Sequence, residues 1–176
     1  MTTQYLFAGF GGQGILFAGK LLAYKGLTEE REVSWLPSYG PEMRGGTANC
    51  SVILSDEPVG APIVLNPDVL VAMNNPSLDK YENDVVPGGK IIVDSSLIER
   101  KVNRTDVEVV YIPATKMASE NGLDGLANMI ICGKLMEMQG EYTEESIEKA
   151  LAKCISARHA DLLEFNRKAL EMGKAF

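Results

Sequence analysis

The sequence contains one histidine, His159, and three cysteines, Cys50, Cys132 and Cys154, which lie far apart and form no Cys-x-x-Cys pair. This set excludes a zinc site of the His and Cys type, an iron–sulfur motif and a Ser-His-Asp triad beside the glycine-rich segments. We therefore predict no catalytic residue and no metal site in this chain. We expect the cysteines to be reduced, mostly buried thiols and His159 to be an exposed structural residue.

Long apolar runs and an excess of positive charge are also missing. No run approaches the roughly 20 apolar residues that span a membrane, and the first apolar stretch lacks the length and the basic start of a secretion signal. The 24 acidic residues outnumber the 17 basic ones, for a formal net charge of −7. A broad nucleic-acid surface requires the opposite balance. These absences predict a cytoplasmic protein that binds neither membranes nor nucleic acid.

Short apolar runs alternate with helical patterns along the 176 residues, a length typical of one domain. Strands are predicted over 5–8, 32–37, 47–54, 68–73, 90–96 and 107–113. Helices are predicted over 15–26, 76–86, 114–122, 124–140 and 143–172, the last as one helix or two. We expect a single α/β domain over residues 1–176, a Rossmann-like three-layer fold with a mostly parallel sheet and a helical C-terminal tail.

Polar and glycine residues at the ends of these elements give finer expectations. Ser77, Asp124 and Thr143 are predicted to cap helix N-termini, and Gly26 a helix C-terminus. Asp94 ends a predicted strand and is expected to cap a helix, with contact to a ligand at that edge as the alternative.

The segment Gly9-Phe10-Gly11-Gly12-Gln13-Gly14 matches G-x-G-x-x-G between a predicted strand and a predicted helix. Glycines there let the backbone approach a phosphate, which the free N–H groups of the helix start then bind. The alternative is a tight strand-to-helix turn without a ligand.

Two nucleotide-binding classes fit this segment poorly. A nicotinamide site needs an acidic residue after the second strand, but Ser38 follows that strand and the nearest acids, Glu29, Glu30 and Glu32, precede or begin it. The spacing from Gly14 to Lys20 resembles an ATP-binding loop, yet Leu21 stands where Ser or Thr must bind magnesium.

A second unusual segment runs from Ser38 to Cys50, "SYGPEMRGGTANC". Arg44, between two glycine-containing turns, offers a fork of donors to phosphate or carboxylate. Because this segment follows the second strand, we expect it beside the glycine turn at the ligand edge of the sheet. The alternative is a partner-facing loop with Arg44 in a surface ion pair.

Five motifs in order, "GFGGQG", "SYGPEMRGGTANCSV", "NPDVLVAMN", "GGKIIVDSS" and "ANMIICGKL", resemble the gamma subunit of 2-oxoacid:ferredoxin oxidoreductases over about residues 4–140. The resemblance implies a complex that converts a 2-oxoacid and coenzyme A (CoA) to acyl-CoA, carbon dioxide and reduced ferredoxin. The loop "YGPEMRGGTAN" is most similar to the 2-oxoglutarate branch, with succinyl-CoA as product. The branched-chain (2-oxoisovalerate) branch is the alternative.

The resemblance also implies a division of labour. Thiamine diphosphate lies between the alpha and beta subunits, and iron–sulfur clusters lie in the beta and delta chains. The gamma chain contributes CoA binding and active-site closure, and is inactive alone. Self-association of the isolated chain through its partner-facing surface is a further expectation.

Carried onto this sequence, the resemblance implies ligand-binding residues in both glycine-rich segments and one helix. They are Gly9, Gly11, Gly12, Gln13, Gly14, Tyr39, Arg44, Gly45, Gly46, Thr47 and Asn128. Three other interpretations stay open: a stand-alone Rossmann-like module for NAD or FAD, a subunit whose glycine turn serves assembly only, and an indolepyruvate oxidoreductase subunit.

Overall fold

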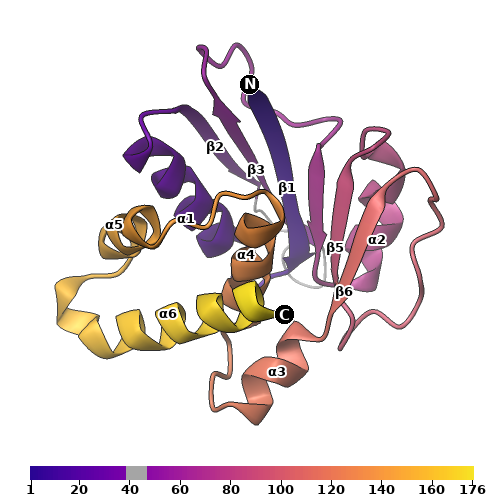
Figure 1. The fold of residues 1–176 in the computed structure, drawn as a ribbon. Helices are drawn as coiled ribbons and strands as arrows, with labels where there is room; N and C mark the ends of the chain where they lie inside the picture. The colour runs from indigo at the N-terminus through magenta and orange to yellow at the C-terminus, as the bar shows by residue number, and fades with distance from the viewer. Residues whose placement is uncertain (39–46) are drawn as a thin grey trace.

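A computed structural model describes residues 1–38 and 47–176 and has three layers, with helices on both faces of a central sheet (Figure 1). The strands are β1 (Thr2–Phe10), β2 (Glu32–Ser38), β3 (Thr47–Ser55), β4 (Val69–Ala72), β5 (Lys90–Asp94) and β6 (Glu108–Ile112). The helices are α1 (Ile15–Thr28), α2 (Asn75–Tyr81), α3 (Ala114–Glu120), α4 (Ala127–Met138), α5 (Glu144–Cys154) and α6 (Ala160–Ala175), with 3₁₀ turns η2 (Glu82–Asp84) and η3 (Ala157–His159). The predicted α/β class and every predicted strand are confirmed.

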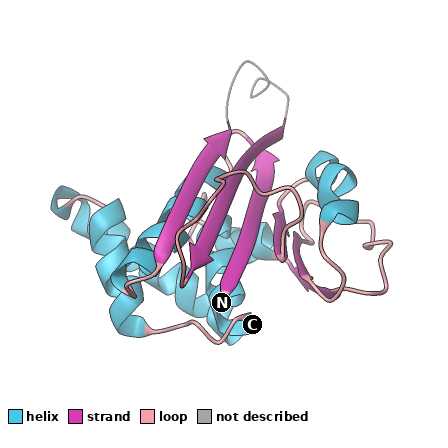
Figure 2. Ribbon diagram, turned by 90° about the horizontal axis from the view of Figure 1, so that it is seen from above, coloured by secondary structure: helices cyan, strands magenta, loops and turns pink. Residues whose placement is uncertain are grey.

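Across the described residues the sheet has the order β2-β3-β1-β4-β5-β6. Strands β1, β4, β5 and β6 are parallel neighbours, as predicted. Strand β3 runs antiparallel to both β1 and β2, so β2 and β3 form an antiparallel pair at one side of the sheet (Figure 2). The sheet is therefore mixed and mostly parallel.

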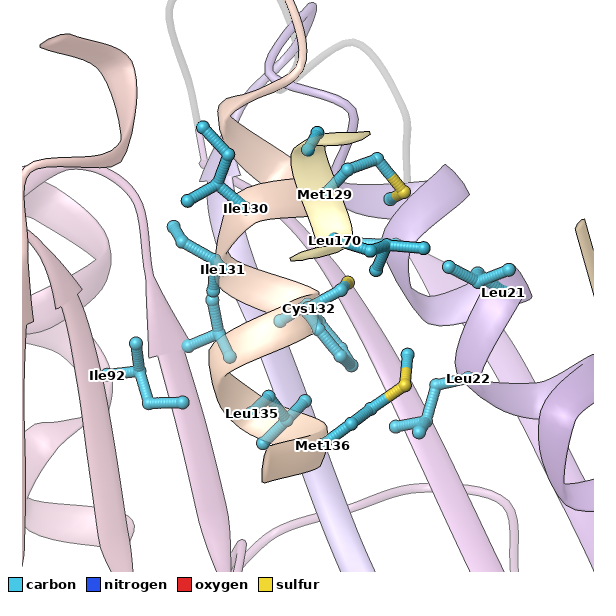
Figure 3. Close-up of a cluster of buried hydrophobic side chains, with 14 of the residues drawn as sticks. Leu21, Leu22, Ile92, Met129, Ile130, Ile131, Cys132, Leu135, Met136 and Leu170 are labelled. Atoms are coloured by element: carbon cyan, nitrogen blue, oxygen red, sulfur yellow. The ribbon is translucent and has the colours of Figure 1, made fainter. Parts of the chain in front are cut away.

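Alternation along the strands divides the core between the two sheet faces. Tyr5 and Phe7 of β1 pack with α1, α4, α5 and α6, whereas Leu6 packs on the face covered by α2. Helix α4 lies in the larger core. Figure 3 shows its side chains between Ile92 of β5 on one side and Leu21 and Leu22 of α1 on the other. Because other elements enclose α4, its sequence is apolar on every face of the helix.

Two glycines bring α4 and α6 unusually close together. A Cβ atom at Gly133 of α4 would come well under 3.0 Å from the Leu170 carbonyl oxygen, and one at Gly173 of α6 would overlap the Ile130 carbonyl oxygen in the same way. Each glycine therefore faces the backbone of the other helix. This contact holds the C-terminal helix against the core.

The helix ends correct several sequence predictions. Asn74, not Ser77, caps α2: its Oδ1 accepts a hydrogen bond from Ser77 N at 2.8 Å. Gly26 lies inside α1 and does not end the helix. A side chain at this position would collide with Leu54 of the sheet, so the glycine permits α1 to pack closely against β3.

Helix α4 begins later than predicted. Asp124 does not cap it, since Gly125 has a left-handed backbone with φ 82 that interrupts the helix, and Leu126 occupies the cap position. Thr143 stands at the cap position of α5, as predicted, but its side chain makes no capping hydrogen bond. The predicted tail consists of two helices, α5 and α6, separated by η3.

The cysteines are free; Cys50 and Cys132 are buried and Cys154 is half-buried, which confirms the prediction. In the part of the chain that the structure describes, no helix is both long enough and apolar enough to cross a membrane.

The buried hydroxyl of Tyr5 and the buried thiol of Cys50 predict a loss of stability at alkaline pH. Burial raises the pKa of the Tyr5 hydroxyl to about 12 and that of the Cys50 thiol to about 12, from 10.0 and 9.0. Because both pKa values are higher in the folded chain, their stabilisation is complete below about pH 9 and is lost as the pH rises toward about 12. The free energy of unfolding should fall there by about 1.4 kcal/mol per pH unit for each group titrating.

Urea unfolding at stepped pH measures this slope. Replacing Cys50 by alanine should make the free energy of unfolding fall less steeply between about pH 9 and 10. In this range the Cys50 thiol of the unfolded chain loses its proton, whereas the Tyr5 hydroxyl still keeps its own. A free energy of unfolding that stays flat through this range would show that the burial of these groups carries no such penalty.

Candidate functional site

The glycine turn connects the end of β1 to the start of α1. Gly12 and Gly14 have left-handed backbones, with φ 92 and φ 73, a conformation that glycine adopts without strain. Gly11 and Gly12 are exposed, and a Cβ at Gly12 would meet no atom within 4 Å in the part of the chain that the structure describes. The turn thus presents bare backbone to its surroundings.

Gln13 fixes this turn to the neighbouring strand. Its Oε1 accepts a hydrogen bond from Phe10 N at 2.7 Å, and its Nε2 donates to the Met73 carbonyl oxygen at 3.0 Å, just beyond β4. Gly9 leaves the room that this side chain occupies, because a Cβ there would lie 2.5 Å from Gln13 Oε1. Both ends of the amide therefore hold the turn in place.

Asn128 of α4 holds the other end of the turn. Its Nδ2 donates to the Gly14 carbonyl oxygen at 3.1 Å, and a side chain on Gly14 would overlap this amide. Asn128 is 4% exposed, and its Oδ1 has no hydrogen-bond partner among the described residues. Asn128 therefore contacts the glycine turn directly, and its role as a ligand residue stays a prediction.

The N-terminus of α1 is open toward an anion. Gly14 supplies no side-chain cap, and the first turn of α1 contains no acidic residue. The first N–H groups of a helix lack partners within it and carry its positive dipole end. A cleft of about 340 Å³ lies at this point, lined by Phe10, Gly11, Gly12, Gly14, Ile15, Leu16, Phe17 and Ala48.

The second glycine-rich segment starts and ends at the same edge of the sheet. Thr47, the predicted site residue that begins β3, pairs with Phe10, and Ser38 at the end of β2 pairs with Asn49. The two described ends of this segment therefore lie at the edge of the sheet that carries the glycine turn, and the position of the loop between them stays a prediction. The predicted ligand residues Tyr39, Arg44, Gly45 and Gly46 lie outside the described residues.

Asp94 accepts a hydrogen bond from the first turn of α3. Its Oδ2 accepts from Thr115 Oγ1 at 2.6 Å and its Oδ1 from Ser96 N at 3.1 Å. It is completely buried. The predicted capping role is thus matched by a contact with the first turn of a helix.

The described residues offer little for acid–base or metal chemistry. Burial raises the pKa of the Cys154 thiol to about 11, so it is protonated at neutral pH. His159 is exposed, as predicted, and lies in η3 between the last two helices. Within residues 1–38 and 47–176, no group of His, Cys, Asp and Glu side chains is placed to hold a metal ion. Among the described residues, the site therefore consists of exposed glycine backbone, the N-terminus of α1 and a cleft beside them.

Sequence reasoning missed Asn166 of α6, a buried polar residue close to this region. It is 5% exposed and, like Asn128, leaves its Oδ1 without a partner among the described residues. The available signal was a polar residue in line with Leu162 and Ala169, on the apolar stripe of the C-terminal helix.

Residues 4–176 match the family described as pyruvate ferredoxin/flavodoxin oxidoreductase. The chain belongs to this family. The resemblance found in the five sequence motifs is therefore confirmed, over a longer stretch than those motifs cover.

Two relatives and one solved structure place the chain within the pyruvate ferredoxin/flavodoxin oxidoreductase family. It is 40% identical over 166 residues to ketoisovalerate oxidoreductase subunit VorA of Methanothermobacter thermautotrophicus, covering 94% of this chain and 34% of that subunit. It is 37% identical over 179 residues to 2-oxoglutarate synthase subunit KorC of Methanocaldococcus jannaschii, covering 99% of this chain and 95% of the relative. The chain thus spans about a third of the VorA subunit but nearly all of KorC.

The structural comparison agrees. The 2-oxoglutarate:ferredoxin oxidoreductase of Magnetococcus marinus, solved with 2-oxoglutarate, coenzyme A and succinyl-CoA bound, superposes with a TM-score of 0.88 at 25% identity. The match covers 99% of this chain and 30% of that one. A single domain of this family is therefore a separate chain in some members and part of a longer chain in others.

Proposed function

We propose that this chain is the gamma-type subunit of a cytoplasmic 2-oxoacid:ferredoxin oxidoreductase and that its glycine turn holds the phosphates of CoA. The observation that carries the proposal is the uncapped N-terminus of α1 behind the exposed Gly11 and Gly12. Backbone N–H groups at such a position suit a phosphate. Family membership and the CoA bound in the M. marinus enzyme support the choice of ligand.

Thiamine diphosphate and the iron–sulfur clusters belong, in this proposal, to the alpha and beta, and where present delta, subunits. The described residues do not fit an iron–sulfur cluster, because they contain no group of His, Cys, Asp and Glu side chains that could hold a metal ion. When bound, CoA supplies the thiol that accepts the acyl group. This chain binds its phosphates, closes over the active site, and passes no electrons to ferredoxin itself.

A nicotinamide-binding module is the second candidate, and the fold argues against it. The acidic ribose-binding residue would stand at the end of the parallel strand next to β1. That strand is β4, and Met73 and Asn74 follow it. The Met73 carbonyl oxygen accepts from Gln13 and the Asn74 side chain caps α2, so both are used within the chain.

The substrate is proposed to be 2-oxoglutarate, with 2-oxoisovalerate as the alternative, because KorC and VorA are both close relatives. Dye reduction by the purified complex with CoA and each of 2-oxoglutarate, 2-oxoisovalerate and pyruvate separates them. The highest kcat/KM is expected for 2-oxoglutarate. A preference for 2-oxoisovalerate would assign the branched-chain reaction instead.

Arg44 is proposed as a charged contact to a CoA phosphate. Replacing it by alanine should leave the complex assembled and raise the KM for CoA by roughly tenfold or more, since a charge-assisted hydrogen bond contributes about 1.5–3 kcal/mol. Steady-state kinetics with varied CoA measure this. The exposed Arg158 in η3 offers a control that removes the same charge. Unchanged kinetics for Arg44→Ala would take Arg44 out of the site.

A further inference from the structure

The loop of residues 56–68, between β3 and β4, lies over the face of the sheet opposite α1. Helix α1 packs against β2 and β3 from the other face, where Gly19 of α1 leaves room for Trp35 of β2. Side chains alternate along a strand, so Leu36 points to the face that carries the loop. In Figure 2 this side of β1, β2 and β3 is toward the viewer, with a loop crossing in front of the strands and helices behind them.

Three exposed aliphatic side chains gather on this face. Val64 of the loop is buried against the sheet, and its N donates to Ser51 Oγ at 3.3 Å. Its neighbours Ile63 and Leu65 are 59% and 73% exposed. Leu36 is 37% exposed and pairs with Ser51 across the strands, so it lies beside Val64 on the same face. We call Leu36, Ile63 and Leu65 the apolar patch.

A cleft of about 320 Å³ opens beside the apolar patch, between the loop and the strands β1 and β3. Its lining includes the apolar side chains of Ile53, Val59 and Ile63 and the acidic Glu57. A cleft of this kind can receive a side chain from another protein, as the central residues of stable interfaces require. Exposed apolar side chains next to a cleft indicate an interaction site.

The charged groups at the border of the apolar patch are mostly acidic. Glu32 is exposed and points to the same face of β2 as the patch, and the exposed Glu57 lines the cleft. Asp56 pairs with the Met1 amino group and lies 3.7 Å from Arg31 Nε, so its charge is already balanced within the chain. The carboxylates of Glu32 and Glu57 therefore favour a partner with lysine or arginine around an apolar centre.

The lengths of the relatives indicate the kind of partner. The chain spans about a third of VorA but nearly all of KorC. Where the domain is part of a longer chain, the linkage keeps its neighbour at a high effective concentration. A separate chain has to hold the same neighbour by contact alone. A second copy of this chain fits the patch poorly, because residues 32–38 and 47–79 contain no lysine or arginine and the carboxylates would meet their own kind.

We propose that the apolar patch docks onto the subunit that corresponds to the rest of the VorA chain, through apolar side chains surrounded by lysine or arginine. The proposal rests on the proposed function, which places this chain in a complex with such a subunit. One apolar side chain of the partner enters the cleft beside Ile63, and Leu36 and Leu65 are buried around it.

Substitutions of Leu65 test this surface. The complex is purified anaerobically with the wild-type chain, with Leu65→Lys and with Leu65→Asp, and its dissociation on dilution is followed by light scattering. Leu65→Lys should raise the dissociation constant by at least about tenfold, the effect of leaving one leucine unburied. Leu65→Asp should raise it less, because the partner's border is basic. Both isolated variants should keep the wild-type Tm, since the side chain is mostly exposed in the free chain.

Leu27→Lys is the matched control. Leu27 is 54% exposed and lies in the last turn of α1, where a lysine suits the helix dipole. This variant should leave the dissociation constant unchanged.

A wild-type dissociation constant for both Leu65 variants would overturn the docking surface. Dye reduction by those complexes with a 2-oxoacid and CoA would then leave the proposed function intact. Equal losses for the lysine and aspartate variants would overturn the basic border of the partner. If Leu65→Lys abolished self-association of the chain and not assembly of the complex, the occupant would be a second copy and the proposal would fail. A wild-type chain that co-purifies with no other subunit would contradict the proposed function itself.

Discussion

Gly173→Ala is expected to destabilise the protein, although alanine favours a helix interior by about 1 kcal/mol over glycine. The added Cβ would overlap the Ile130 carbonyl oxygen and lie 3.0 Å from Lys134 N, so α6 can accept it only by moving away from α4. Both obstacles are backbone atoms, which cannot rotate aside as a side chain does. Overpacking of this kind costs about 1–3 kcal/mol and occasionally more.

Thermal and urea unfolding show whether Gly173→Ala lowers or raises the stability of the protein. Packing predicts a fall in Tm of about 2–12 °C for a domain of this size, whereas helix propensity alone predicts a rise. Gly60→Ala is the control, since nothing lies within 4 Å of a Cβ there and its backbone is not left-handed; it should change stability by less than about 0.5 kcal/mol. A Gly173→Ala protein as stable as the wild type would mean that α4 and α6 are not in such close contact.

Gly12→Val should raise the KM for CoA by at least about tenfold, because the phosphate would lose its hydrogen bonds to the backbone of the turn. A Cβ at Gly12 meets no atom of the described residues within 4 Å, so the new side chain would stand in the cleft through which a phosphate is proposed to approach. The substitution therefore tests ligand approach more than packing. Kinetics of the assembled complex with varied CoA give the result.

Backbone strain must be separated from this effect. Gly12 has φ 92, and a valine there costs on the order of 1–3 kcal/mol whatever the ligand does. Gly140, at the end of α4, has φ 67 and equally open surroundings, so Gly140→Val carries comparable strain away from the turn. If both variants lose stability but only Gly12→Val loses CoA affinity, the phosphate site is supported. Normal CoA binding by Gly12→Val would exclude the turn as that site.

Much of the fold follows from local patterns in the sequence. The strands and most helices were predicted because apolar periodicity distinguishes a strand from an amphipathic helix. The direction of β3 could not be predicted, because an alternating pattern of apolar residues is the same for a parallel and an antiparallel strand. Only the pairing of β3 with β1 and β2 shows that it runs antiparallel. Gly26 was misread as a cap because a glycine required by packing against Leu54 looks, in sequence, like one that ends a helix.

Part of the candidate site could likewise be predicted from the sequence, and part is seen only in the folded structure. The glycine turn was predicted because its residues are contiguous and its chemistry is local. The clamp from Gln13 to Met73 and the contact from Asn128 to Gly14 join residues that are 60 and 114 positions apart, which no local pattern reveals. For Asn128 the family resemblance supplied what spacing could not. Asn166 has no motif, and only its unpartnered oxygen in the folded chain singles it out.

The account is tested most directly by asking whether this chain works inside a CoA-dependent oxidoreductase. The tagged chain is purified anaerobically from its native host, and the preparation is assayed for viologen dye reduction with 2-oxoglutarate, with and without CoA. The account predicts co-purifying subunits that carry thiamine diphosphate and iron–sulfur clusters, and dye reduction that requires both substrates. A chain that purifies alone and supports no reduction with any 2-oxoacid would contradict it.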